Sequence, residues 1–167
     1  YSFVNANADL PELYQSERGA VPKVFDYNIP LANGTYEVTL HFAEVWWGAP
    51  GGREGGIGSR VFDVEIEGNK VLDDYDVIED VGTLTEVTKT FTVIVIDGSL
   101  DMNFDAAGSD GANEPTLAGI EVLSQVPNEA PVVVADSDIT SGPAPLAVEF
   151  DGSGSSDDKG ITAYAWD

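Results

Sequence analysis

The 167-residue chain contains no cysteine, so neither a disulfide nor thiolate chemistry is available to it. Basic residues are also scarce: 7 Lys and Arg stand against 30 Asp and Glu, which gives a formal net charge of −23. Phosphate binding needs clustered Lys and Arg, so we expect no nucleic-acid partner and no docking on an anionic membrane. No apolar run reaches the ~20 residues of a membrane-spanning helix, so we expect no direct membrane insertion.

What the chain does contain is many short apolar runs separated by turns, with 18 Gly and 9 Pro. This pattern predicts an all-β fold. Residues 35–45 alternate apolar and polar side chains, which is typical of a half-buried strand. Asn33-Gly34 before them predicts a hairpin turn, and Val93 to Ile96 predict a strand covered on both faces. Residues 1–20 are expected to be irregular and residues 73–80 to form a loop. Further strands are expected at 23–29, 60–66, 70–72, 86–96, 100–104 and 117–123.

The composition changes near residue 124, and the Pro-containing stretch 125–131 predicts an extended linker. We therefore expect one domain over residues 1–124 and a second over residues 132–167. Short strands are expected in the second domain at 132–135, 146–151 and 161–166. Tyr1 is not preceded by a signal peptide, and we interpret the chain as a mature or excised piece of a larger protein.

Several sequence phrases resemble the malectin and malectin-like domains in order, spacing and residue type. They are LYQSER at 13–18, FDYNIP at 25–30, GTYEVTLHFAE at 34–44, RVFDV at 60–64, the segment 71–77 and the segment 115–123. The resemblance implies a malectin-like β-sandwich, a jelly-roll-type lectin fold that binds glucose-type oligosaccharides at an end built from loops. The N-terminal strand of that family looks incomplete here. Residues 128–131, 150–157 and 161–167 resemble the polycystic-kidney-disease (PKD) type repeat, an immunoglobulin-like sandwich of which this chain holds about half.

Trp46 and Trp47 are the first candidates for ligand contact. They stand where a strand runs into a Gly-rich loop, and adjacent strand residues point to opposite faces, so the two rings are hard to bury together. A sugar C–H face stacks on an indole, and the indole N–H bonds a hydroxyl. In malectin, the aromatic pair after this Phe-Ala-Glu-Val phrase contacts the sugar. The alternative is that one ring is core and the other covers a loop.

A second candidate group is Asn113 with its neighbour Glu114. Asn113 is placed by the following Pro115 at the position of a family acidic residue that hydrogen-bonds the ligand, while the alternative is a loop-closing Asn. Gly19 stands where the family has a ligand-stacking Tyr, so one wall of the site is expected to be missing. Tyr1 and Tyr14 are further residues that can line the site.

Four charged residues, Arg18, Glu44, Arg60 and Asp76, are expected to support the site rather than touch ligand, because a partly buried Arg–carboxylate pair can pin loops to a sandwich. His41 is the single histidine and has no Cys, His or Ser partner pattern for metal or triad chemistry. No cofactor is required. Asp151, Asp157 and Asp158 offer oxygen ligands suited to calcium, with a solvated turn as the alternative.

The sequence thus predicts a non-catalytic carbohydrate-binding module of a secreted or cell-surface multidomain protein. Its partners are carbohydrate and further domains or copies of a surface assembly. The rival prediction is a structural or adhesive β-sandwich subunit of a surface protein or filament, assembled by strand exchange. A third class is a calcium-dependent adhesion module, whose melting temperature rises with added calcium.

Overall fold

The computed structural model describes residues 2–4, 10–19, 23–108, 111–125, 129–158, 160–163 and 165. The chain divides into two compact units, Tyr1–Val126 and Pro127–Asp167. The division falls inside the stretch for which the sequence predicts a linker. Regular structure is nearly all antiparallel β, which confirms the expected fold class.

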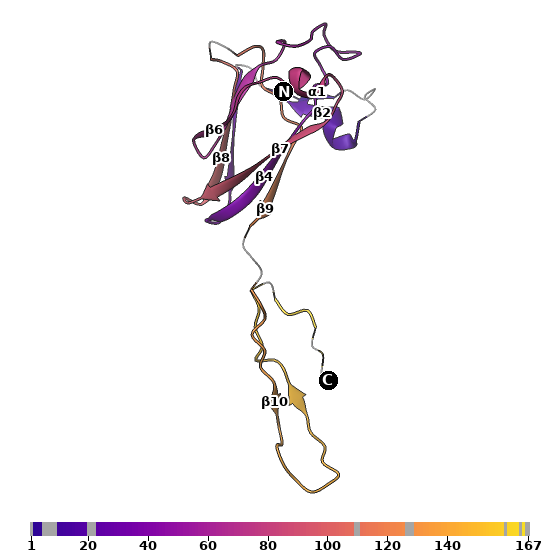
Figure 1. The fold of residues 1–167 in the computed structure, drawn as a ribbon, viewed down its shortest axis with the longest axis vertical. Helices are drawn as coiled ribbons and strands as arrows, with labels where there is room; N and C mark the ends of the chain where they lie inside the picture. Colours follow the sequence, from indigo (N-terminus) through magenta and orange to yellow (C-terminus); the bar gives the residue numbers. More distant parts are fainter. Residues whose placement is uncertain are drawn as a thin grey trace. The chain divides into compact units, whose positions relative to one another are not determined.

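Two antiparallel sheets form the first unit (Figure 1). One has the strand order β3-β8-β5-β6, and the other has the order β7-β4-β9. Their strands are β3 (Val24–Pro30), β4 (Gly34–Phe42), β5 (Phe62–Ile66), β6 (Asn69–Tyr75), β7 (Val87–Val95), β8 (Ser99–Asp105) and β9 (Gly119–Ser124). The unit also contains the paired strands β1 (Ser2–Val4) and β2 (Ser16–Arg18), the 3-10 helix η1 (Glu12–Gln15) and the helix α1 (Val77–Val81).

The core lies between the two sheets and follows the period-2 pattern of the strands. On β4 every second residue is buried, as the alternation predicts. The facing strands of the other sheet do the same. The main contributors are Tyr36, Val38, Leu40, Phe42, Phe62, Val64, Ile66, Leu100, Met102 and Phe104. Burial of this apolar surface, at about 25 cal/mol per Å², is the main force that holds the sheets together.

The strand registers gather the long connections at one end of this unit. The end of β4 lies beside the starts of β7 and β9, and the end of β8 lies beside the starts of β3 and β5. The connections 43–61 and 106–118, with α1 and β2, therefore share one end, where Figure 1 shows α1 and β2 close together. The short turns at 31–33, 67–68 and 96–98 lie at the other end. We call the first of these the loop end.

The predicted Asn33-Gly34 hairpin is wrong. Strands β3 and β4 belong to different sheets, so the turn carries the chain across the sandwich. A type I′ hairpin turn needs positive φ at both central residues, and neither Asn33 nor Gly34 has it. Instead, the Asn33 amide donates to the Ile96 carbonyl at 2.7 Å. Glu67 and Gly68 do have positive φ (51° and 69°), and they join the true hairpin of β5 and β6.

Three other expectations need correction. Strand β7 is not covered on both faces, because Ile94 and Ile96 are 63% and 74% exposed. Residues 73–80 are not a loop, since β6 continues to Tyr75 and Asp76 then caps α1. Residues 1–20 are not wholly irregular, because β1, η1 and β2 lie within them. Elements of three or four residues are too short for a periodic signal.

The second unit contains one pair of two-residue strands, β10 (Asp136–Ser137) and β11 (Phe150–Asp151). An isolated bridge joins Val132 to Ser156. In the described residues, the three strands expected here are therefore shorter or absent. Of the expected strand 161–166, the structure describes residues 161–163 and 165, and these lie outside any strand. Strands are stabilised by packing one face, and here Val133 and Phe150 stay mostly exposed. The immunoglobulin-like PKD-type assignment stays a prediction.

Candidate functional site

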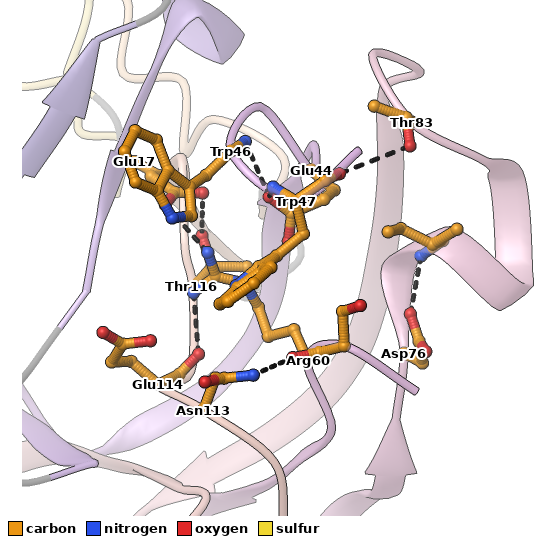
Figure 2. A network of polar contacts seen from close by, with 12 residues as sticks. Glu17, Glu44, Trp46, Trp47, Arg60, Asp76, Thr83, Asn113, Glu114 and Thr116 are labelled. Carbon is orange, nitrogen blue, oxygen red and sulfur yellow. Dashed lines mark hydrogen bonds and ion pairs between the residues drawn. The ribbon is translucent and has the colours of Figure 1, made fainter. Parts of the chain in front are cut away.

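A buried charge network stands at the loop end, centred on Arg60 (Figure 2). Arg60 Nε donates to Glu44 Oε2 at 2.6 Å, and Arg60 Nη2 donates to Glu17 Oε1 at 3.0 Å. All three side chains are at most 1% exposed. Arg60 Nη1 donates to the carbonyl of Glu114 at 2.7 Å, and Thr116 Oγ1 donates to Glu17 Oε2 at 2.8 Å. One arginine therefore ties β2 to the connections 43–61 and 106–118.

The local sequence explains why these charges point inward. Glu44 continues the even-numbered series that β4 buries, two residues beyond Phe42. Glu17 is the buried middle residue of β2, between half-buried Ser16 and exposed Arg18. Arg60 immediately precedes the isolated bridge of Val61 to Ala112, which lies just before β5. The alternation of β2 and β4 thus turns Glu17 and Glu44 inward before their charges are considered.

Two carboxylates share one guanidinium in this network, so it carries an excess negative charge when both are ionised. Burial raises the pKa of Glu17 to about 7, the Arg60 guanidinium opposes this shift, and the Glu44 carboxylate adds to it. Glu17 is therefore the group of the network that takes up a proton near neutral pH.

Glu44 also positions the tryptophan pair. Its Oε1 accepts hydrogen bonds from the backbone N–H of Trp46 at 2.8 Å and of Trp47 at 2.9 Å. Both indole side chains are partly exposed, and Figure 2 shows them leaving the backbone in different directions, with the Trp46 ring on the side of Glu17. The carboxylate that pairs with Arg60 thus also sets the backbone from which both rings project.

The Trp47 ring is largely engaged by its own loop. The Arg53 guanidinium carbon lies 5.7 Å from the ring centroid, and Gly55 packs so closely that an added Cβ would stand 3.1 Å from the ring. Trp47 Nε1 is buried and has no hydrogen-bond partner in the described part of the chain. The Trp47 carbonyl accepts from Thr83 Oγ1 at 3.5 Å. The Trp47 ring is therefore partly covered, and its contacts with Arg53 and Gly55 stabilise the loop.

A cavity of about 460 Å³ opens on the same loop, lined by Gly48, Ala49, Pro50, Gly52, Arg53, Glu54 and Gly55. Its size falls within the ~300–1,000 Å³ range of small-molecule sites. This stretch is rich in glycine, yet backbone hydrogen bonds hold it in place: the Gly48 N–H donates to the Arg53 carbonyl at 2.7 Å, and the Arg53 N–H donates to the Trp46 carbonyl at 2.8 Å.

The second candidate pair lies on the opposite connection. The Asn113 amide donates to the Ser59 carbonyl and so links the two loops, and its backbone has a positive φ of 57°. Both features match the alternative of a loop-closing Asn. The Asn113 amide oxygen has no hydrogen bond in the part of the chain that is described. Glu114 is half-buried and contributes its carbonyl to Arg60. Asp76 caps α1 and accepts from the Gly58 N–H at 2.5 Å, which ties α1 to the tryptophan loop.

Other predicted residues lie elsewhere. Arg18 does not join the Arg60 network; its guanidinium covers the rings of Phe25 and Tyr27 at 4.6 and 4.4 Å. Tyr14 is buried and its hydroxyl bonds His41 Nδ1 at 2.7 Å, so it packs rather than lines an open site. Gly19 is also buried. Tyr1 lies outside the described residues.

Two of the three calcium candidates of the second unit, Asp151 and Asp158, accept hydrogen bonds from backbone groups. Asp151 accepts from the Ser153 N–H at 2.8 Å, a bond that holds the pKa of Asp151 below its usual value. Asp158 accepts from the Glu129 N–H at 3.2 Å. Within the described ranges, no group of three or more His, Cys, Asp or Glu side chains is arranged to hold a metal ion. Calcium binding by Asp151, Asp157 and Asp158 stays a prediction.

Sequence reasoning missed Glu17, Thr116 and Arg53. Glu17 looks like a surface charge because its flanking residues are polar, and only the sandwich topology brings it to Arg60. Thr116 is one of many hydroxyl residues in the chain. Arg53 lies in the middle of a Gly-rich stretch without periodicity. The one available signal was the proximity of Arg53 to Trp46 and Trp47 in the sequence.

Comparisons with known proteins agree on the first unit. The malectin domain model matches residues 1–120. A probable LRR receptor-like serine/threonine-protein kinase of Arabidopsis thaliana is 32% identical over 132 residues, which are 73% of this chain and 12% of the kinase. Malectin-B of Xenopus laevis is 28% identical over 109 residues, or 65% of this chain and 37% of that protein.

The solved complex of the plant peptide RALF23 with FER and LLG2 contains a chain of the same fold. Its TM-score is 0.59 at 25% identity, over 75% of this chain and 32% of that chain. The present chain therefore spans about an eighth of the kinase and about a third of the other two proteins. In the described part of the chain, no helix has the length and apolar character needed to cross a membrane.

Proposed function

Because the chain belongs to the malectin domain family, we propose that it is a non-catalytic carbohydrate-binding module that takes glucose-type oligosaccharide at its loop end. Malectin-like domains are a carbohydrate-binding fold type and are generally not catalytic. The related receptor kinases are matched through their extracellular parts, which supports a place outside the cell or on its surface. The parent protein would then be secreted or cell-surface and multidomain.

The hydrogen bonds that the backbone N–H groups of Trp46 and Trp47 donate to the Glu44 carboxylate carry this proposal. They hold two adjacent, partly exposed indoles at the end of the sandwich where the loops meet. In this proposal the Trp46 ring stacks on the sugar, while Trp47 supports the loop that bears Arg53. The amide oxygen of Asn113, which has no hydrogen bond within the described residues, and the carboxylate of Glu114 would accept from sugar hydroxyls.

The two carboxylates of the Arg60 network support binding rather than hydrolysis. Glu17 and Glu44 are buried and held on Arg60, so neither can reach a glycosidic bond without breaking the network. A glycosidase needs two carboxyl groups that flank the scissile bond in an open cleft. The raised pKa of Glu17 follows from burial and is consistent with a structural role.

A glycan array tests the proposal, with the native chain beside the double variant Trp46→Ala/Trp47→Ala. We expect selective binding to glucose-type oligosaccharides, and a loss of at least about tenfold in the variant, because buried aromatic contacts usually dominate such interfaces. The matched control is Ile94→Ala/Ile96→Ala, which removes two exposed apolar side chains far from the loop end. The proposal would be overturned if a folded native sample bound no glycan on the array. It would also be overturned if the tryptophan double variant and the isoleucine control bound equally well.

One observation favours the second candidate function, a structural or adhesive subunit. Among the described residues of the second unit the strands are two residues long, and Val132, Val133 and Phe150 are 63%, 77% and 63% exposed. Short strands at a sheet edge that expose apolar side chains are common acceptors for an added strand. Sedimentation velocity over a hundredfold range of concentration separates the two functions. An assembly that grows with concentration supports the subunit, and a constant monomer excludes it.

A further inference from the structure

The cavity on the tryptophan loop places opposite charges side by side. Arg53 and Glu54 are both exposed and both line it, and the rest of its lining is Gly, Ala and Pro. A guanidinium donates several N–H bonds in a fixed plane, and a carboxylate only accepts. A lining of this kind matches a group that is donor and acceptor at once, as two neighbouring hydroxyls are.

The backbone of this cavity is held in place before any ligand arrives. Arg53 bridges to Trp47, donates its N–H to the Trp46 carbonyl at 2.8 Å, and accepts from the Gly48 N–H at 2.7 Å. Gly52 lies so close to the Trp46 carbonyl that any Cβ would overlap it. The loop therefore pays little ordering entropy when a ligand binds.

The Arg53 side chain is held by an aromatic ring rather than by an acid. Its guanidinium lies over Trp47, and in the described ranges it makes no ion pair, although the chain has 30 acidic residues. An arginine stacked on a ring keeps its in-plane N–H groups available for hydrogen bonds. The donors of Arg53 are thus directed by Trp47 and remain available beside the tryptophan pair.

We propose that this cavity is a second sugar subsite, which takes a neutral hexose unit next to the one held at Trp46. In it, Arg53 donates to one of two neighbouring hydroxyls and Glu54 accepts from the other. Neutral sugar is favoured because a uronate carboxylate would meet Glu54 and the surface of a chain with net charge −23. The subsite rests on the proposed function and extends it to the length and charge of the ligand.

The test is a calorimetric affinity series with glucose and with the α1,4- and β1,4-linked glucose di- and tetrasaccharides. For the linkage that the native chain binds, we expect Arg53→Gln/Glu54→Gln to lower the affinity for the tetrasaccharide about tenfold and to leave the affinity for glucose unchanged. Arg53→Lys keeps the charge but loses the planar donor pair. Its affinity for the tetrasaccharide should therefore lie between those of the native chain and the double variant. Equal losses for glucose and tetrasaccharide, or no loss for either, would overturn the subsite. Thermal melting of each variant shows whether the fold is kept.

A tetrasaccharide that contains a charged sugar tests the preference of the subsite for neutral sugar. The native chain should bind a tetrasaccharide that contains glucuronate at least tenfold more weakly than the neutral one, and Glu54→Gln should narrow that difference by removing one repulsive charge. An unchanged difference would contradict the role of Glu54. If the native chain binds none of the sugars, the proposed function itself fails. If the sugars bind but the Arg53 and Glu54 variants behave as native, only the subsite fails.

Discussion

The first unit places one cation between two carboxylates twice, once in its interior and once on its surface. Arg60 bonds Glu44 and Glu17 at 2.6 and 3.0 Å, and Lys70 bonds Asp63 and Asp73 at 2.6 and 2.7 Å. The geometry of the two clusters is similar. Their environments differ, since Arg60 is 1% exposed and Lys70 is 43% exposed.

This difference decides what each cluster can do. In water, an exposed pair is screened and adds little, whereas buried charges are strongly coupled and costly to leave unpaired. The chain distances differ too. Lys70 joins residues of one hairpin, while Arg60 joins β2 with the connections 43–61 and 106–118. We therefore expect the buried cluster to hold the loop end together and the exposed one to be dispensable.

The largest effect is expected from Arg60→Met, which keeps the bulk of the side chain and removes the buried cation. Two buried carboxylates then lack their partner, and the free energy of unfolding should fall by about 3–5 kcal/mol. Denaturant unfolding at pH 7, followed by tryptophan fluorescence, measures it. A loss below about 1 kcal/mol would show that the network contributes little to the fold.

An intermediate effect is expected from Glu17→Gln, and it depends on pH. The pKa of Glu17 is about 7 in the fold and 4.5 as its ordinary value, so between these pH values the folded state holds more protons than the unfolded state. Its contribution to stability is therefore present below pH 4.5 and is lost as the pH rises through 7. Between pH 4.5 and 8, the free energy of unfolding of the native chain should fall by about 3 kcal/mol relative to that of Glu17→Gln.

The variant and the native chain share every other acidic group, so general charge repulsion cancels in this difference. Gln can keep the bond to Arg60 through its amide oxygen, and Thr116 Oγ1 can accept from its NH₂ group. Chemical unfolding of both proteins from pH 4.5 to 8 gives the two curves. Parallel curves would mean that Glu17 stays ionised throughout and that Arg60 outweighs the cost of burial.

The smallest effect is expected from Lys70→Met, the same cation-to-methionine change on the surface. Lys70 and its two partners, Asp63 and Asp73, are all exposed to water at least in part, so the unfolding midpoint should stay within experimental error of the native value. The measurement is the same denaturant titration as for Arg60→Met. A loss comparable to that of Arg60→Met would contradict the view that burial, rather than pairing geometry, separates the clusters.

The sandwich was predictable where one periodic signal decided the outcome. The alternation of Tyr36, Val38, Leu40 and Phe42 fixed the buried face of β4, because a strand places every second side chain on one face. The same reasoning failed at Asn33-Gly34. A turn motif describes local backbone preference, whereas the pairing of β3 with β8 and of β4 with β7 depends on contacts across the whole sheet.

The candidate site was predictable in part for the same reason. The adjacency of Trp46 and Trp47 is a local feature, and the sequence shows it directly. The partnership of Glu17 with Arg60 spans 43 residues and that of Glu17 with Thr116 spans 99. Such partnerships arise only when the loops converge, so no sequence window contains them. Arg53 was missed because its role depends on the fold of its loop, which brings its side chain onto Trp47.

The most direct test of sugar binding at the loop end uses the indole N–H signals of the chain in ¹⁵N-resolved NMR. The chain has three tryptophans, and Trp166 lies in the sequence beyond the residues 1–120 that the malectin domain model matches, so it serves as an internal reference. On addition of a glucose tetrasaccharide, the Trp46 and Trp47 signals, assigned by Trp→Phe variants, should shift while the Trp166 signal stays. A saturating sugar concentration that moves no indole signal, or moves that of Trp166 alone, would contradict the account.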